Sequence, residues 1–339
     1  MPLLRTAYSL LFALTMVALS ACESPQMGLR PAASGFDHDG PEQRLTNLTA
    51  LDQRVARVAW RLSTANTDLC PVVRQSAGWA LHSAGQYSAE MRSYAESRFS
   101  LDGDLPGVLS APSGSPAALA ALETGDVIVS VNGERMTPGA SGRAAQFEGL
   151  AANIARLDAA FARGPAELSV RRRGQLISTR IQPVSACGYE VQLNPSDELN
   201  ARADGRRLFI STALASFAQT DDDLALILGH ELAHNVLRHR SWSETGGEGR
   251  TVVAADCDPR LCADGNHERQ ADRVGLYLMA RAGYDPAIAA PFWRRFAESN
   301  WRVRYPSLAH ASAGVRATRL EAVQAEIEAK RASGEPLLP

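Results

Sequence analysis

The stretch that most constrains this chain is the pentapeptide HELAH at residues 230–234, which falls in a segment with helical spacing of apolar residues. Thr220 and the acidic residues 221–223 predict a capping box and an acidic first turn for that helix. A helix turns by about 100° per residue, so residues four apart project from one face, one turn apart. His230 and His234 can therefore bind a single zinc ion together.

Glu231 follows the first histidine and is rotated from it by about 100° around the helix. A carboxylate in that position can reach a water on the metal without becoming a ligand. A catalytic zinc usually takes three protein ligands and keeps one position open, so a further ligand is required. His239, five residues after His234, is predicted to point elsewhere. Leu237 and Arg240 stand where metzincin proteases carry Gly and His, which excludes that class.

A second helix is predicted to begin near Asn266 and to end at Gly283, with a proline shortly beyond. Glu268 and Asp272 lie four residues apart on it and so share one face. Glu268 suits the third ligand position, and Asp272 suits a carboxylate that orients a zinc-bound histidine. The glycine-rich stretch 241–265 between the helices is interpreted as a surface loop near the cleft, either a lid or an inert insertion.

The histidine pair and the downstream Glu-x-x-x-Asp pair are followed by Ala-Gly-Tyr-Asp-Pro at residues 282–286. In this combination the chain resembles the gluzincin metallopeptidase family forty-eight, which includes proteases of the HtpX, Oma and BepA types. The resemblance covers residues 191–320. It implies a helix-rich, zincin-type metallopeptidase domain of the α+β class.

The resemblance also assigns roles to individual residues. Glu231 would be the general base, and Asn200 and Ala201 would lie on an edge strand along which a polypeptide substrate binds. His310 and Arg316 match the spacing of a late family motif, with Ala311 in place of its proline. His310 would act over the zinc, either stabilising an oxyanion or occupying the open position in latent members, while Arg316 would support the ligands from behind. The implied ligands of one Zn²⁺ per chain are His230, His234 and Glu268.

The first residues predict export and a membrane anchor. Arg5 and the apolar run 7–19 form a signal-peptide pattern over residues 1–21. The Leu-Ser-Ala-Cys sequence that ends at Cys22 resembles the lipobox of bacterial lipoproteins, which implies acylation of Cys22 and a periplasmic lipoprotein branch of the family. An uncleaved anchor or an ordinary signal peptide is the alternative. By the same resemblance, Glu23 after the cysteine implies the outer membrane of the bacterial cell envelope rather than the inner one. Residues 22–43 are predicted to be a flexible tether.

The remaining four cysteines are an even number in a chain predicted to be exported, which suggests two disulfides. Pairing Cys70 with Cys187 and Cys257 with Cys262 is the preferred of three connectivities, because the first pair brackets a candidate inserted module and the second lies in one loop. A zinc cluster of cysteines is the rival interpretation, although no Cys-x-x-Cys spacing occurs.

The chain is predicted to divide into three folded regions after the tether. Residues 44–101 form an N-terminal helical region that packs on the peptidase domain, residues 102–185 an inserted β-rich module, and residues 186–339 the zinc metallopeptidase domain. The motifs at residues 114–133 resemble a PDZ domain of bacterial proteases, which implies binding of an extended peptide by strand addition. A structural spacer that binds nothing is the alternative for this module.

The net charge of the chain limits the kinds of partner that it can bind. Thirty-five Lys and Arg against 37 Asp and Glu give a net charge of −2, which predicts no nucleic-acid partner. Together, these features predict a zinc-dependent endopeptidase of the cell envelope that cleaves misfolded or unassembled envelope proteins. The alternative is an envelope chaperone or assembly scaffold with a latent zinc site and a PDZ-like binding module.

Overall fold

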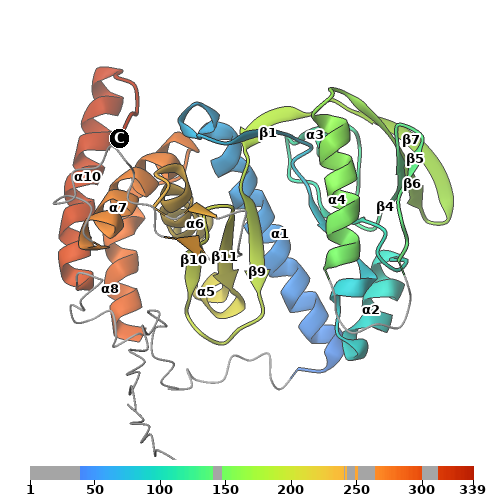
Figure 1. The fold of residues 1–339 in the computed structure, drawn as a ribbon. Coiled ribbons are helices and arrows are strands. Elements are labelled where there is room, and N and C mark those ends of the chain that lie inside the picture. The colour runs from blue at the N-terminus through green and yellow to red at the C-terminus, as the bar shows by residue number, and fades with distance from the viewer. Residues whose placement is uncertain (1–38, 140–146, 240, 243–248, 251–263, 300–311) are drawn as a thin grey trace, which may run out of the picture.

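The computed structural model describes residues 39–139, 147–239, 241–242, 249–250, 264–299 and 312–339. The described part combines a helix-rich half with a β-rich half, and helix α1 (Pro41–Ala65) runs between them (Figure 1). The α+β class expected from the sequence is confirmed. Four expected features lie outside the described residues: the leader at 1–21, Cys22, the pair Cys257 and Cys262, and His310.

The helix-rich half is built around a buried apolar core shared by its helices. Leu224 and Leu228 pack in that core with Tyr277, and all three side chains are fully buried. Val58 and Leu62 of α1 belong to the same core, so α1 packs on this half. The helices are α5 (Thr212–Phe217), α6 (Asp221–Val236), α7 (Asp264–Arg281), α8 (Ala289–Ser299) and α10 (Ala313–Ser333).

A three-stranded sheet in the order β10-β11-β9 lies against α6. Strand β11 (Arg207–Ser211) is the central strand. It pairs in parallel with β9 (Glu190–Asn194) and antiparallel with β10 (Ala201–Ala203). Strand β10 is thus an edge strand, as expected for the segment that contains Ala201; Asn200 directly precedes it.

The β-rich half has a separate core beneath a six-stranded sheet. Helix α4 (Glu148–Phe161) contributes Leu157 and Phe161 to this core, facing Ile128 and Val170 of the sheet. The main path of the sheet runs β2-β3-β4-β6-β7, and β5 pairs with β4. The strands are β2 (Ala80–His82), β3 (Gly107–Ser110), β4 (Val127–Val131), β5 (Glu134–Arg135), β6 (Ala166–Arg172) and β7 (Gln175–Ile181), and the short helix α3 (Pro116–Leu119) follows β3.

The hairpin between β6 and β7 illustrates how local sequence specifies this half. Arg173 and Gly174 have φ values of 50° and 81°, as a two-residue hairpin turn of type I′ requires. Glycine reaches this region without a steric penalty, so the Arg-Gly pair favours the turn. Strands β6 and β7 flank this turn and pair from Ala166 with Ile181 to Arg172 with Gln175.

The boundary between the N-terminal region and the β-rich half lies earlier in the chain than expected. Residues 44–101 were expected to pack as one helical region on the peptidase domain, but only part of them does so. Strand β2 joins the β-rich sheet, with Leu81 opposite Val108, and Phe99 of α2 (Ala89–Phe99) packs in a cluster with Leu109. The apolar residues of this stretch find their partners in distant strands, so the β-rich half begins earlier than residue 102. Helix α1 likewise begins at Pro41, within the range expected to be tether.

The chain enters and leaves the β-rich half through paired strands and a disulfide. Strand β1 (Val73–Ser76) pairs antiparallel with β8 (Val184–Cys187). Next to this pair, Cys70 and Cys187 form a disulfide with their Cα atoms 5.6 Å apart. This confirms the first of the two expected bridges and ties together both ends of the inserted segment.

We expect removal of this disulfide to destabilise the protein strongly. The bridge joins residues 117 positions apart, and loss of such a long closed loop costs about 2–5 kcal/mol of folding free energy. Cys70→Ala with Cys187→Ala should lower the urea midpoint by a corresponding amount. Wild type reduced with dithiothreitol is the matched control, because reduction breaks the S–S bond and adds only one hydrogen to each sulfur. An unchanged midpoint in both samples would contradict the prediction.

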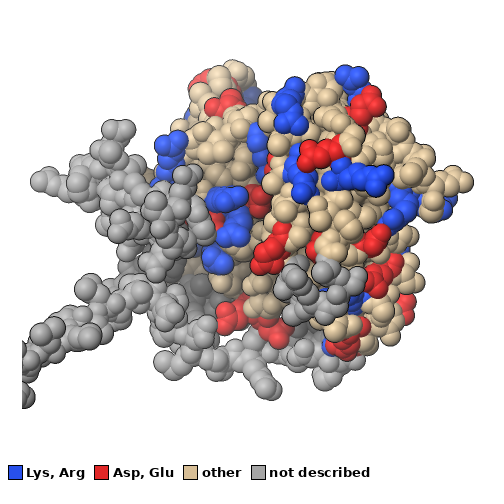
Figure 2. Space-filling view, turned by 45° about the vertical axis from the view of Figure 1, so that its right-hand side comes forward, with Lys and Arg blue, Asp and Glu red and all other residues tan. Residues whose placement is uncertain are grey.

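Two further observations concern the surface. Among the helices of the described residues, none has both the length and the apolar character that crossing a membrane requires. On the face shown in Figure 2, the described Lys and Arg side chains are intermingled with Asp and Glu. This face therefore presents no broad field of one sign.

Candidate metal centre and substrate cleft

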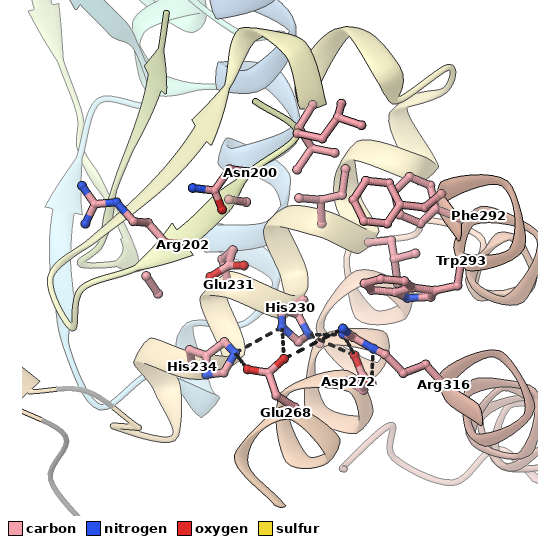
Figure 3. Close-up of a pocket in the computed structure, with 18 of the residues that line it drawn as sticks. Asn200, Arg202, His230, Glu231, His234, Glu268, Asp272, Phe292, Trp293 and Arg316 are labelled. Atoms are coloured by element: carbon pink, nitrogen blue, oxygen red, sulfur yellow. Dashed lines mark hydrogen bonds and ion pairs between the residues drawn. The ribbon is translucent and has the colours of Figure 1, made fainter. Parts of the chain in front are cut away.

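The first pair of candidate ligands is placed by a well-capped helix. The Thr220 hydroxyl accepts a hydrogen bond from the Asp223 amide at 3.1 Å, and the Asp223 carboxylate accepts one from the Thr220 amide at 3.2 Å. The expected capping box is thus confirmed, and α6 begins at Asp221. His230 and His234 follow on one face of this helix and point towards α7 (Figure 3).

The second pair of acidic residues reaches the histidines because α6 and α7 approach unusually closely. A Cβ on Gly229 would lie 2.8 Å from the Gly275 carbonyl oxygen, and a Cβ on Gly275 would lie 2.8 Å from the His230 Cα. Only glycine at both positions permits this backbone contact. The contact brings Glu268 and Asp272 of α7 against the histidine face of α6 (Figure 3).

Three donor groups face one another at the centre of the site. The Nε2 atoms of His230 and His234 are 3.1 Å apart. His230 Nε2 lies 3.4 Å from Glu268 Oε2, and His234 Nε2 lies 3.4 Å from Glu268 Oε1. Bonds of about 2.0–2.1 Å at tetrahedral angles would separate zinc ligands by roughly 3.3–3.4 Å. The described residues therefore fit a zinc ion, and His230, His234 and Glu268 form a possible metal site with a His₂Glu donor set known from catalytic zinc sites.

Asp272 and Arg316 lie next to Nδ1 of His230, on the side of the ring away from the three-donor centre. The Asp272 carboxylate lies 3.1 Å from His230 Nδ1 and accepts a hydrogen bond from Arg316 Nε at 2.9 Å. The Arg316 guanidinium also stacks on the Trp293 ring at 3.6 Å. With its Nδ1 beside Asp272, His230 directs Nε2 towards the three-donor centre.

The electrostatics of the centre favour a cation. Burial lowers the pKa of His230, but the Asp272 and Glu268 carboxylates outweigh it and raise this pKa to about 10. Burial raises the pKa of Asp272, but the positive charges of Arg316 and His230 outweigh this effect and hold the pKa of the carboxyl below its ordinary value. The same negative charge that stabilises a proton on His230 would stabilise a divalent metal.

A cleft of about 490 Å³ opens over the centre. Glu231, only 8% exposed, lines it together with the ligands, and Asn200 and Ala201 form part of its border with β10 (Figure 3). The structure thus brings these predicted residues to one place. Phe292 and Trp293 lie across the cleft from Asn200 and Arg202 (Figure 3). Other apolar side chains that line the cleft are Leu226, Ile227 and Phe296.

His239 is not part of the three-donor set, but its contact with His234 was not expected. Helix α6 ends at Val236, and Arg238 adopts a φ of 54°, so the helical projection used for His239 does not apply. The chain turns back instead, and His239 Nδ1 lies 2.9 Å from His234 Nδ1. Burial, together with His234, lowers the pKa of His239 to about 4. The spacing of the histidines could not signal this contact, because it depends on where the helix ends.

Comparison with known proteins supports the motif-based resemblance. Peptidase family M48 matches residues 169–252, which include the HELAH motif. Over 109 residues the chain is 28% identical to mitochondrial metalloendopeptidase OMA1 of Saccharomyces cerevisiae, covering 27% of this chain and 32% of that protein. Over 147 residues it is 24% identical to the beta-barrel assembly-enhancing protease of Yersinia pestis, covering 35% and 30%.

A second OMA1, from Schizosaccharomyces pombe, is 29% identical over 108 residues. The matched part of this chain spans about a third of the length of each of these curated relatives. The resemblance to the family that was inferred from the motifs is confirmed.

Proposed function

We propose that this chain, a relative of peptidase family M48, is a zinc-dependent endopeptidase that hydrolyses peptide bonds in misfolded or unassembled proteins of the bacterial cell envelope. The observation that carries the proposal is the set of facing donor atoms on His230, His234 and Glu268, whose separations fit the edges of a zinc tetrahedron. The Glu231 carboxylate and an edge strand border the same cleft.

The chemistry follows from the positions of the side chains. A bound zinc lowers the pKa of water towards neutrality and polarises a carbonyl. Glu231 accepts the proton of the attacking water and passes it to the leaving amine, which converts a poor leaving group into a good one. Asp272 and Arg316 keep His230 oriented during this exchange.

The cleft favours an extended polypeptide as substrate. Strand β10 is an edge strand of its sheet and can pair with a substrate backbone by strand addition. Folded proteins rarely offer a free extended segment, whereas misfolded or unassembled ones do. The apolar wall of α8, with Phe292 and Trp293, suits a nonpolar substrate side chain.

The cellular location belongs to the same proposal. The lipobox-like sequence before Cys22 supports a lipid anchor, with the outer membrane favoured over the inner one. The beta-barrel assembly-enhancing protease supports a role in the envelope by its name, whereas the name OMA1 is attached to a mitochondrial enzyme. One disulfide in the described part suits an oxidising compartment.

The β-rich half supports a second function, as an envelope chaperone or assembly scaffold with a PDZ-like peptide-binding module. Strand β7 is the outer strand of its sheet and exposes Leu176 at 70% and Ile177 at 36%. An edge strand with exposed apolar side chains is suited to pairing with another chain. The protease proposal takes precedence because the scaffold does not require the zinc-ligand geometry.

Metal removal tests the proposed activity. We expect the purified protein to contain one zinc per chain, and a zinc chelator to abolish its cleavage of unfolded casein, because the donor set then lacks its cation. Added zinc should restore the rate. The control is a non-chelating isomer of the chelator, which should leave the rate unchanged. Undiminished cleavage by protein shown to be free of zinc would refute the proposal.

A further inference from the structure

We infer that His239 is a positioning residue that fixes the tautomer and ring orientation of the metal ligand His234. This inference rests on the proposed function, because it concerns how the same centre holds its metal. It assigns to His239 and Gln270 a role that the sequence pattern did not predict.

The contacts form a continuous chain from α7 to the centre. Gln270 lies on α7, and its Oε1 is 3.0 Å from His239 Nε2. His239 Nδ1 is in turn 2.9 Å from His234 Nδ1. The remaining nitrogen of His234, Nε2, faces His230 Nε2 and Glu268 in the three-donor centre.

The surroundings hold the His239 ring in this place. The His239 amide donates to the His234 carbonyl at 2.9 Å, which closes the turn at the end of α6. The His239 ring stacks on that of His267 with centroids 4.3 Å apart and 18° between the planes. His239 is 6% exposed, so water does not compete freely for its nitrogens.

The hydrogen positions follow from donor and acceptor chemistry. An amide oxygen can only accept, so Gln270 Oε1 requires a hydrogen on His239 Nε2. In a neutral imidazole the other nitrogen, His239 Nδ1, is then an acceptor. His234 Nδ1 must therefore donate to it, which leaves the lone pair on His234 Nε2 and directs it at the metal position.

Each of the two metal-binding histidines thus donates its Nδ1–H to a neighbouring side chain, and the two acceptors differ. Asp272 receives the Nδ1–H of His230 at 3.1 Å, and His239 receives the Nδ1–H of His234 at 2.9 Å. If donor and acceptor were exchanged between His239 and His234, the hydrogen of His234 would be on Nε2, and this nitrogen could not bind a metal.

A pair of substitutions at His239 tests the inference. His239→Phe keeps a ring for stacking on His267 but removes the acceptor, and we expect zinc affinity to fall by about 10–100-fold. His239→Gln offers a carboxamide oxygen as acceptor and should recover much of the affinity. The readout is competition for zinc with a chelator of known affinity, measured beside thermal unfolding of the metal-free proteins.

Substitutions of Gln270 test the inference independently, because they leave His239 unchanged. Gln270→Leu removes the acceptor for His239 Nε2 and should weaken zinc binding, whereas Gln270→Glu keeps an acceptor and should not. A wild-type zinc affinity for His239→Phe would overturn the inference, as would equal losses for His239→Phe and His239→Gln. Either result leaves the protease proposal standing if wild type still binds zinc and cleaves, whereas a wild type without zinc would refute both.

Discussion

Glu231→Gln is expected to reduce peptide cleavage by about 10²–10⁴-fold, the range that general acid–base groups contribute. Glutamine has nearly the same shape but cannot accept the proton of the attacking water. Because Glu231 is not part of the three-donor set, zinc content should remain at one per chain. The measurements are casein cleavage, with zinc content determined on the same preparation.

The matched control for this variant is Glu268→Gln. It makes the same chemical change at a residue assigned as a ligand, so we expect it to lower both zinc affinity and cleavage. If Glu231→Gln cleaves casein at the wild-type rate, the assignment of the base is wrong. The pair therefore separates the proton-transfer role from the ligand role at positions that share one cleft.

The same variant distinguishes the protease from the scaffold. A protease mechanism predicts that Glu231→Gln fails to rescue the phenotype of a strain that lacks the protein. A scaffold that acts through β7 of the β-rich half needs no proton transfer and predicts full rescue. Equal amounts of folded variant and wild type in the cells, measured by immunoblot, make the comparison valid.

The metal centre was largely predictable because its signals are local. The spacing of His230 and His234 and of Glu268 and Asp272 follows from helix geometry, which depends on a few neighbouring residues. The close approach of Gly229 and Gly275 was not predictable in the same way. It is a contact between two helices, and a single glycine in a helical pattern does not reveal its partner.

The features that the sequence did not predict depend on non-local structure. Strand β2 is short, and it becomes part of the sheet only by pairing with β3, which no local pattern shows. The contact of His239 with His234 was not predicted because α6 ends at Val236, between these two residues. Helix ends are set by capping and tertiary contacts, so angular projections are dependable only within the helix.

Asp272→Ala is expected to impair both folding and metal binding. Asp272, 9% exposed, accepts from the Arg316 guanidinium and contacts His230 Nδ1. Its removal leaves Arg316, 7% exposed, without its nearest carboxylate, and breaking one side of a buried ion pair costs about 3–5 kcal/mol. Loss of the group that orients His230 should also weaken zinc binding by about 10–100-fold. Urea unfolding of the metal-free protein and chelator competition measure the two effects.

The double variant Asp272→Ala with Arg316→Met separates these two effects. Methionine fills much of the space under Trp293 without a charge, so the cost of an unpaired buried cation disappears and most of the folding free energy should return. Zinc affinity should stay low, because nothing then accepts the hydrogen of His230 Nδ1. Recovery of both properties would mean that Asp272 serves only to neutralise Arg316. Recovery of stability alone would establish that the carboxylate orients the metal ligand.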